Sequence, residues 1–322
     1  MKRYKLLNNV LGWVVFVIAA VTYILTLEST ASFWDCGEFI ASGYKLEVGH
    51  PPGNPIFMLT ARFFANFASS PSEVAYMVNL MSGLLSAATI LLLFWTITRL
   101  AQKIVLREGE TEETMSLGQM IAILGCGLVG ALAYAWSDTF WFSAVEGEVY
   151  AYSSFCTALV FWLILKWESV ADLPHANRYI ILIAYIIGVS IAVHLLNLLC
   201  IPAIVLVYYY RKYKNTDLKG SLIALLVSFV LIVLLLYGLV PGFVEVASWV
   251  ELLFVNVFHL PFNSGVVFYF FLIVGVIAWA IYETYAQRSD KLIKISFLIS
   301  IVLVGIPFIG DGYIIGIVLT AA

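Results

Sequence analysis

The residues best suited to chemistry lie between positions 32 and 57, in the stretch "SFWDCGEFIASGYKLEVGHPPGNPIF". Asp35 and Glu38 are three residues apart, a spacing that sets two carboxylates on one face of a helix. His50 follows, directly before a Pro-Pro-Gly turn. A partly desolvated carboxylate has a raised pKa and is therefore a better base. Proton abstraction during a group transfer is the chemistry that this pattern favours.

The rest of the chain indicates a membrane as the setting. Hydrophobic residues make up 62% and charged residues 11% of the sequence, and the mean hydropathy is +0.99. A soluble domain carries about a quarter charged residues, so this chain has too few to cover a water-facing surface. The net charge of -3 indicates no partner, and we expect no nucleic acid to bind. The composition predicts an all-α, polytopic transmembrane protein.

Hydrophobic windows predict about nine or ten membrane segments, near 7–27, 74–98, 118–136, 150–166, 179–194, 195–210, 220–240, 266–286 and 292–309. The last residues, "GDGYIIGIVLTAA", resemble the start of another segment. We therefore expect one transmembrane domain over 1–322 that is the N-terminal part of a longer protein.

The region 179–210 decides the topology. A single helix there would be about 48 Å long, against a hydrocarbon core of about 30 Å, so we predict a hairpin of two short segments. Cations stand at both ends, Arg178 and "RKYK" at 211–214. With the hairpin, all Lys and Arg except Lys45 and Arg62 face the cytoplasm, as the positive-inside rule expects. The outer face then receives Asp35, Glu38, His50, Arg62, Glu146, Glu148, His194, Asn197 and His259.

The first outer loop, 28–72, is long enough to hold structure of its own. Residues 34–46 and 56–68 have the spacing of two interfacial helices. The segment "HPPGNP" separates them, because proline removes a backbone donor and disfavours helix in the residue before it.

This loop resembles the signature loop of the protein O-mannosyltransferase-like membrane proteins, which carry D-x-G-E followed by H-P-P-G. The similarity continues through "RFF" at 62–64, "VNLMSGLLSA" at 78–87, "WFSAVEGEVYA" at 141–151 and "HLLNLLCIPA" at 194–203. Such proteins are similar to the GT-C glycosyltransferases, polytopic enzymes that take a sugar from a polyprenyl-phosphate donor outside the cytoplasm. The resemblance implies that Asp35 is the catalytic carboxylate and Glu38 its companion.

The activity that the resemblance implies is transfer of a sugar, with mannose as the candidate, to hydroxyl groups of an exported protein. In a bacterium the site would face outward from the cytoplasmic membrane. One base suffices, since a phosphate leaves without protonation. Arg62 is favoured for the phosphate because its planar fork binds two oxygens, and His50 is a further candidate. No cofactor is implied, and the need for a metal stays open.

Four more polar residues are candidates for substrate binding. Glu146 and Glu148 are two apart, so on a helix they would point different ways; one would bind the acceptor and the other would cap the next span. His194 and Asn197 lie at the apex of the predicted hairpin. Polar groups at that depth either bind a substrate or form an interhelical hydrogen bond that satisfies the backbone of the apex. Both interpretations stand.

Two other classes of protein compete with a transferase. A transporter would place ionisable groups near the middle of the membrane, whereas here they gather at one surface. An assembly protein without activity is the other alternative. A zinc protease is disfavoured because no HExxH motif is present. A transporter with its pathway elsewhere would work without Asp35, and a transferase would not.

Overall fold

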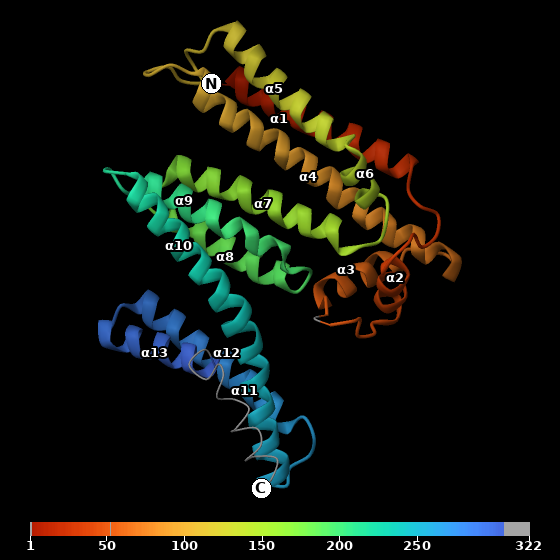
Figure 1. Ribbon diagram of the computed structural model, residues 1–322, viewed down its shortest axis with the longest axis vertical. Coiled ribbons are helices and arrows are strands. Elements are labelled where there is room, and N and C mark those ends of the chain that lie inside the picture. Colours follow the sequence, from red (N-terminus) through yellow and green to blue (C-terminus); the bar gives the residue numbers. More distant parts are fainter. Residues whose placement is uncertain (1, 52, 306–322) are drawn as a thin grey trace. The chain divides into compact units, whose positions relative to one another are not determined.

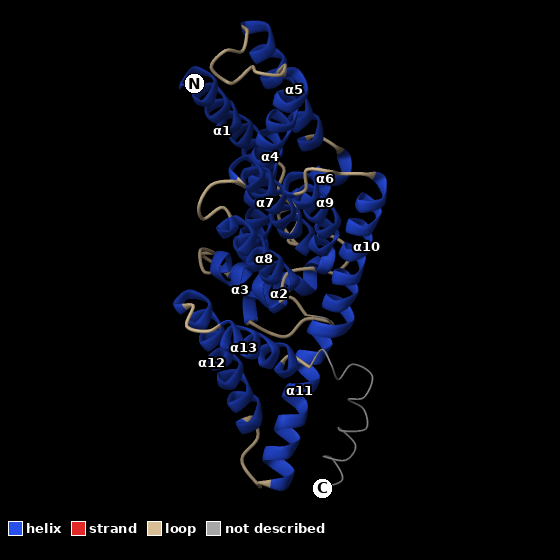
Figure 2. Cartoon of the chain, turned by 90° about the vertical axis from the view of Figure 1, so that its left-hand side faces the viewer, coloured by secondary structure: helices blue, strands red, loops and turns tan. Residues whose placement is uncertain are grey.

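The computed structural model describes residues 2–51 and 53–305 of the chain (Figure 1). Helices and loops make up this part, and it contains no strand (Figure 2), which confirms the predicted all-α class. The expected segment at 310–322, the end of the window 292–309 and Pro52 lie outside the described residues. The helices form two compact units, Met1–Asp217 and Leu218–Ala322.

The first unit contains both the long helices and the short helices of the first outer loop. Its elements are α1 (Lys2–Leu25), α2 (Cys36–Lys45), α3 (Pro55–Ala65), η1 (Pro71–Glu73), α4 (Val74–Val105), α5 (Leu117–Ala135), α6 (Asp138–Ala144), α7 (Val149–Val170), α8 (Asn177–Ile191), η2 (Leu195–Cys200) and α9 (Ile201–Lys212). The two interfacial helices expected in the loop are therefore present as α2 and α3.

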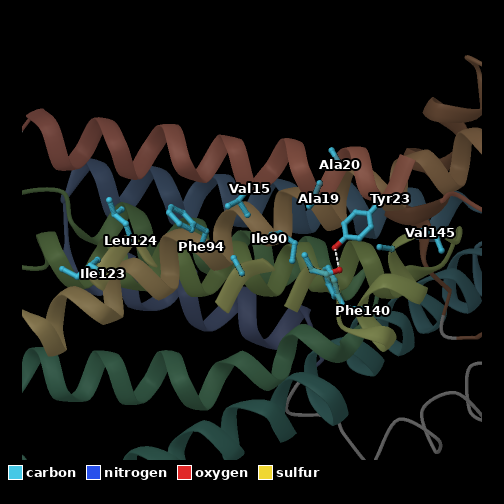
Figure 3. Close-up of a cluster of buried hydrophobic side chains, with 14 of the residues drawn as sticks. Val15, Ala19, Ala20, Tyr23, Ile90, Phe94, Ile123, Leu124, Phe140 and Val145 are labelled. Carbon is cyan, nitrogen blue, oxygen red and sulfur yellow. Dashed lines mark hydrogen bonds between the residues drawn. The ribbon is translucent and has the colours of Figure 1, made fainter. Parts of the chain in front are cut away.

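The core around α4 holds the first unit together. Apolar side chains of α1, α4, α5 and α6 pack into one buried cluster (Figure 3). The hydroxyl of Tyr23 on α1 donates to the carbonyl of Ala135 at the end of α5, over 2.9 Å. A methyl group on Gly127 of α5 would come within 2.5 Å of Thr98 on α4, so glycine is what lets these two helices approach. The outer-loop helices pack against α4 through a second cluster.

The chain reverses between α8 and α9, as the hairpin prediction requires. At the end of α9, Arg211 donates through Nε to the carbonyl of Glu168 over 3.0 Å. Lys212 donates to the carbonyl of Ala171 over 2.9 Å. Since these acceptors lie at the end of α7, a few residues before α8 begins, both ends of the pair lie at the same end of the unit. The predicted hairpin is confirmed.

Among the described residues, seven helices are long and apolar enough to cross a membrane, fewer than the nine windows predicted. The window 179–194 corresponds to α8, which has 15 residues and is about 22 Å long. The window 292–309 corresponds to α13 (Asp290–Leu303), which has 14 residues. Hydropathy windows do not register where a helix breaks, and both of these helices end early.

The second unit contains α10 (Leu218–Leu234), η3 (Leu235–Leu239), α11 (Val240–Leu252), η4 (Leu253–Val257), α12 (Ser264–Ala286) and α13. The first four elements form one helical run of 40 residues, longer than the predicted 220–240. Both η3 and η4 are π-helical turns. The first of them, η3, ends just before Pro241 at the start of α11. Proline has no N–H to give to the preceding turn, so the hydrogen-bond register widens there and the helix continues.

Candidate active site

Helix α2 brings Asp35 and Glu38 to one face, as predicted. Asp35 is the N-cap residue, and its side chain makes no capping hydrogen bond. Its carbonyl accepts from the backbone N–H of Phe39 over 2.9 Å, which starts the helix. One side-chain oxygen each of Asp35 and Glu38 and one ring nitrogen of His50 lie within 4.8 Å of one another, and all three residues are exposed. The three residues at the centre of the sequence prediction are therefore adjacent.

Glu38 and His50 hold each other in place. The backbone N–H of His50 donates to Glu38 Oε1 over 2.7 Å, and His50 Nδ1 lies 3.2 Å from both carboxylate oxygens. The backbone hydrogen bond, followed by that of the ring, lowers the pKa of Glu38. Glu38 is thus kept as an ionised acceptor, which suits a positioning group better than a base.

The loop from Leu46 to Asn54 carries His50 back over α2. Leu46 has the left-handed φ of 56° that ends α2. A methyl group on Gly49 would lie 3.2 Å from the methyl of Met58, 3.3 Å from Glu38 Oε1 and 3.6 Å from Asn54 Oδ1, so both oxygens lie near this glycine. Asn54 is 8% exposed, and its Oδ1 accepts no hydrogen bond. Asn54 was not among the predicted site residues, since its only signal in the sequence is its position beside the prolines.

The start of α3 is joined to the apex of the α8–α9 hairpin. Pro55 occupies the first turn of α3 and has no N–H to offer. The next backbone N–H, that of Ile56, donates to the carbonyl of Ala192 over 3.1 Å, directly after the end of α8. Two groups that helix ends leave unpaired therefore satisfy each other. This bond fixes the outer loop against the hairpin.

Glu146 and Glu148 lie in a non-helical turn, which corrects the expectation that a helix would point them apart. The turn fits closely against α4, because a methyl group on Gly147 would come within 2.9 Å of Asn79 Oδ1. The amide of Asn79 in turn donates to the carbonyl of Glu28 over 2.7 Å. Glu148 is the N-cap residue of α7, as predicted for one of the pair, but its side chain makes no capping bond.

Burial changes the protonation of this acidic pair. The carboxyl residues Glu146 and Glu148 are only 5% and 6% exposed. Burial, followed by the charges of Glu146 and Asp35, raises the pKa of Glu148 to about 7. Burial also raises the pKa of Glu146. Glu148 therefore shares the electrostatic environment of Asp35, and its pKa of about 7 lies near neutral pH.

Arg62 does not join the cluster of Asp35, Glu38 and His50. Its guanidinium donates to the backbone carbonyl of Tyr44 and lies 5.1 Å from the centre of the Tyr44 ring. These contacts tie α3 to the end of α2. The other outer-loop cation, Lys45, lies 3.8 Å from Glu47. Whether Arg62 binds a phosphate stays a prediction.

His194 and Asn197 occupy the predicted apex but have different surroundings. Asn197 is fully buried and donates to Ser190 Oγ over 2.8 Å, which favours the interhelical hydrogen bond for this residue. The ring of His194 lies 5.5 Å from that of Tyr150 on α7. Its Nδ1 accepts from the backbone N–H of Leu196 over 3.1 Å, and burial lowers its pKa. His194 therefore lies beside the segment that carries Glu148.

The sequence that forms this site is similar to that of proteins with known names. A family model described as the protein O-mannosyl-transferase TMEM260 N-terminal domain matches residues 35–217. The mouse protein O-mannosyl-transferase TMEM260 is 27% identical over 209 residues, which cover 65% of this chain and 27% of the mouse protein. The Dictyostelium discoideum protein of the same name is 23% identical over 189 residues, 56% of this chain and 20% of that protein.

This chain therefore spans 27% or less of the length of these two relatives. No solved structure matches it. The matched region begins at Asp35 and ends at the last residue of the first unit, so it contains every residue of the site described above.

Proposed function

Since the chain belongs to the family of the protein O-mannosyl-transferase TMEM260 N-terminal domain, we propose that it carries the active site of a membrane glycosyltransferase. The enzyme transfers a sugar, with mannose as the candidate, from a polyprenyl-phosphate donor to hydroxyl groups of an exported protein. The observation that carries this proposal is the exposed cluster of Asp35, Glu38 and His50, which lies within the region shared with the family.

Asp35 is the proposed base. Its carboxylate is exposed and is not used to cap α2, so an acceptor hydroxyl can reach it. As the hydroxyl oxygen bonds to C1 of the sugar, Asp35 takes the hydroxyl proton. The bond between C1 and the phosphate oxygen breaks at the same time, and the phosphate leaves with the electron pair. Glu38, held by His50, positions the loop and stays ionised.

The buried acidic pair is proposed to bind hydroxyl groups of the acceptor or the sugar. With a pKa of about 7, Glu148 is partly protonated at neutral pH, so it can donate as well as accept a hydrogen bond. His194 lies beside the same segment and is proposed to line this side of the site. Asn197 is fully engaged with the helices around it and is proposed to act through the position of the apex.

The phosphate of the donor is proposed to lie between His50 and Arg62. His50 keeps Nε2 free of the contacts with Glu38, which its Nδ1 makes. Arg62 uses part of its guanidinium on the carbonyl of Tyr44, and its remaining N–H groups are the donors for a phosphate. The GT-C type of mechanism belongs to this proposal as well.

The proposed site faces away from the cytoplasm, and cysteine labelling of intact cells tests this. Cysteines placed next to Glu38 or His259 should react with an impermeant reagent, and cysteines next to Glu112 or Asn215 should not. Labelling at position 215 from outside would refute the sidedness, because the hairpin fixes which end of α9 faces the cytoplasm.

The function itself is tested by mass spectrometry of exported glycoproteins from cells with and without the gene. We expect sugar-modified peptides to disappear with the gene, to return with the wild-type gene, and to stay absent with Asp35→Asn. Glycans that are unchanged in the deletion strain would refute the transferase proposal.

A further inference from the structure

We propose that the cluster of Asp35, Glu38 and His50 binds one divalent cation, with Asn54 Oδ1 as an additional ligand. Mixed oxygen and imidazole ligands favour a cation such as Mn²⁺ or Zn²⁺ over Ca²⁺ or Mg²⁺. The cation would neutralise the donor phosphate, and this role rests on the proposed function. The binding of the cation does not, and it can be measured by itself.

The distances suit a shared ion. A cation bound at about 2.1 Å from each ligand keeps neighbouring ligand atoms about 3.0–3.4 Å apart and opposite ones about 4.2 Å apart. His50 Nδ1 is 3.2 Å from both oxygens of Glu38, and the set that includes Asp35 spans no more than 4.8 Å. The side chains of His50 and Glu38 are 46% and 39% exposed, so small rotations suffice to close the site.

An ion pair between Glu38 and His50 explains only part of this arrangement. It leaves the Asp35 carboxylate without a capping bond, and it leaves Asn54 Oδ1 buried without a donor. A buried acceptor without a partner is costly. Asn54 Oδ1 and Glu38 Oε1 both lie near Gly49, where an added methyl group would be 3.6 Å and 3.3 Å from them and 3.2 Å from the methyl of Met58, so Asn54 is close enough to the cluster to be proposed as a ligand. A cation satisfies both, whereas the ion pair satisfies one.

The charge around the cluster also favours a cation. Asp35 lies in the field of the buried carboxyl group of Glu148, which in turn lies in the field of Glu146. The permanent cations of the outer loop have other contacts: Lys45 is near Glu47, and Arg62 donates to a carbonyl. A phosphate brought to this surface would meet mostly negative charge, and a bound divalent cation reverses the sign of the local field.

The cation and the proposed base are compatible at Asp35. A carboxylate has two oxygens, so one can bind the cation while the other faces the acceptor hydroxyl. The backbone N–H of His50 continues to donate to Glu38 Oε1 and orients that carboxylate, as hydrogen bonds from outside a metal site do. A ring nitrogen that binds a cation carries no proton, so Nδ1 of His50 is deprotonated in the bound state.

The test is Mn²⁺ binding by the full chain, purified in detergent and stripped with EDTA, without donor or acceptor. Electron paramagnetic resonance should detect one bound Mn²⁺ with nitrogen coupling from a histidine. His50→Gln should remove the nitrogen coupling and weaken binding about tenfold or more, the usual effect of losing a ligand interaction. Glu38→Gln should weaken it to a similar extent, and Asn54→Ala to a smaller one. Glu47→Gln, an exposed carboxylate of the same loop, should leave binding unchanged.

Two outcomes would overturn the proposal: no bound Mn²⁺ or Zn²⁺ at millimolar cation, or binding that His50→Gln and Glu38→Gln leave unchanged. Sugar transfer that persists in EDTA, with no bound cation, would refute the cation site and leave the proposed transferase function in place. A bound cation with these ligands in a chain without transferase activity would establish the site and refute the proposed function.

Discussion

Replacing Glu148 with glutamine should stabilise the protein at high pH and not at low pH. The carboxyl group is 6% exposed and lies in the field of Glu146 and Asp35. Ionising it in the folded chain is therefore unfavourable, while in the unfolded chain it ionises at its ordinary pKa of 4.5. Glutamine has nearly the same shape and does not ionise, so it removes this cost.

The sign and size follow from the two pKa values. Below about pH 4.5 the carboxyl group is protonated in both states, and it adds nothing to the pH dependence. As the pH rises toward 7 the unfolded chain ionises first, so the free energy of unfolding falls. From 4.5 to about 7, at 1.36 kcal/mol per pH unit, the ceiling is about 3 kcal/mol. Solvent near the open site screens part of this, which leaves about 1–2 kcal/mol.

The assay is thermal unfolding in detergent with EDTA present, so that no cation screens the acidic groups. At pH 8, Glu148→Gln should raise the midpoint by about 2–8 °C, given 2–4 °C per kcal/mol for a unit of this size. At pH 4.5 the midpoints should nearly coincide. Glu47→Gln, an exposed carboxylate, should change little at either pH. The reasoning would be refuted by a shift of equal size at both pH values, or by a loss of stability at pH 8.

Three further substitutions test the site. Asp35→Asn should lower turnover by roughly 10²–10⁴-fold, the usual contribution of a general base, and Glu38→Gln should lower it less. Steady-state rates with a polyprenyl-phosphate sugar measure both effects, and the opposite ranking would exchange the roles of the two residues. Gly147→Ala should cost about 1–3 kcal/mol of stability in thermal unfolding, because its methyl group would lie 2.9 Å from an α4 side chain. Gly125→Ala, which has open space, is the control, and equal midpoints for both would contradict the packing argument. Arg62→Ala should raise KM for the donor and Arg62→Lys should restore part of it, since lysine lacks the planar fork; an unchanged KM would exclude Arg62 from the phosphate site.

Local pattern predicted much of the outer loop. The prediction that Asp35 and Glu38 share a face holds if residues 36–45 are helical. The prediction of a break after His50 holds if this helix ends before the prolines. Both conditions depend on backbone preferences of a few neighbouring residues. The hairpin was predictable for a different reason, since the length of a bilayer and the position of cations are constraints that any span must meet.

The contacts that complete the site could not be predicted, because they depend on distant parts of the chain. The spacing of Glu146 and Glu148 predicts that on a helix they would point apart, whereas their burial depends on how a turn at Gly147 fits against α4. Asn54 is noticed only because folding buries its side-chain oxygen without a hydrogen-bond donor near Gly49. Arg62 was expected to face a phosphate by its charge, yet Tyr44 lies within its reach. Residue type limits what a side chain can bind, and tertiary packing decides what it meets.

The backbone bond between Ile56 and Ala192 has a consequence for biosynthesis. Its two partners are far apart in the sequence, so α3 leaves the ribosome and enters the membrane well before the end of α8 exists. At about 5–20 residues per second, the interval is on the order of ten seconds. During that time the loop that carries His50 lacks its anchor at the hairpin, and the immature site packs against α4 and the start of α7. A nascent chain halted before residue 192 should therefore expose this loop to proteases that cannot cut it in the finished protein.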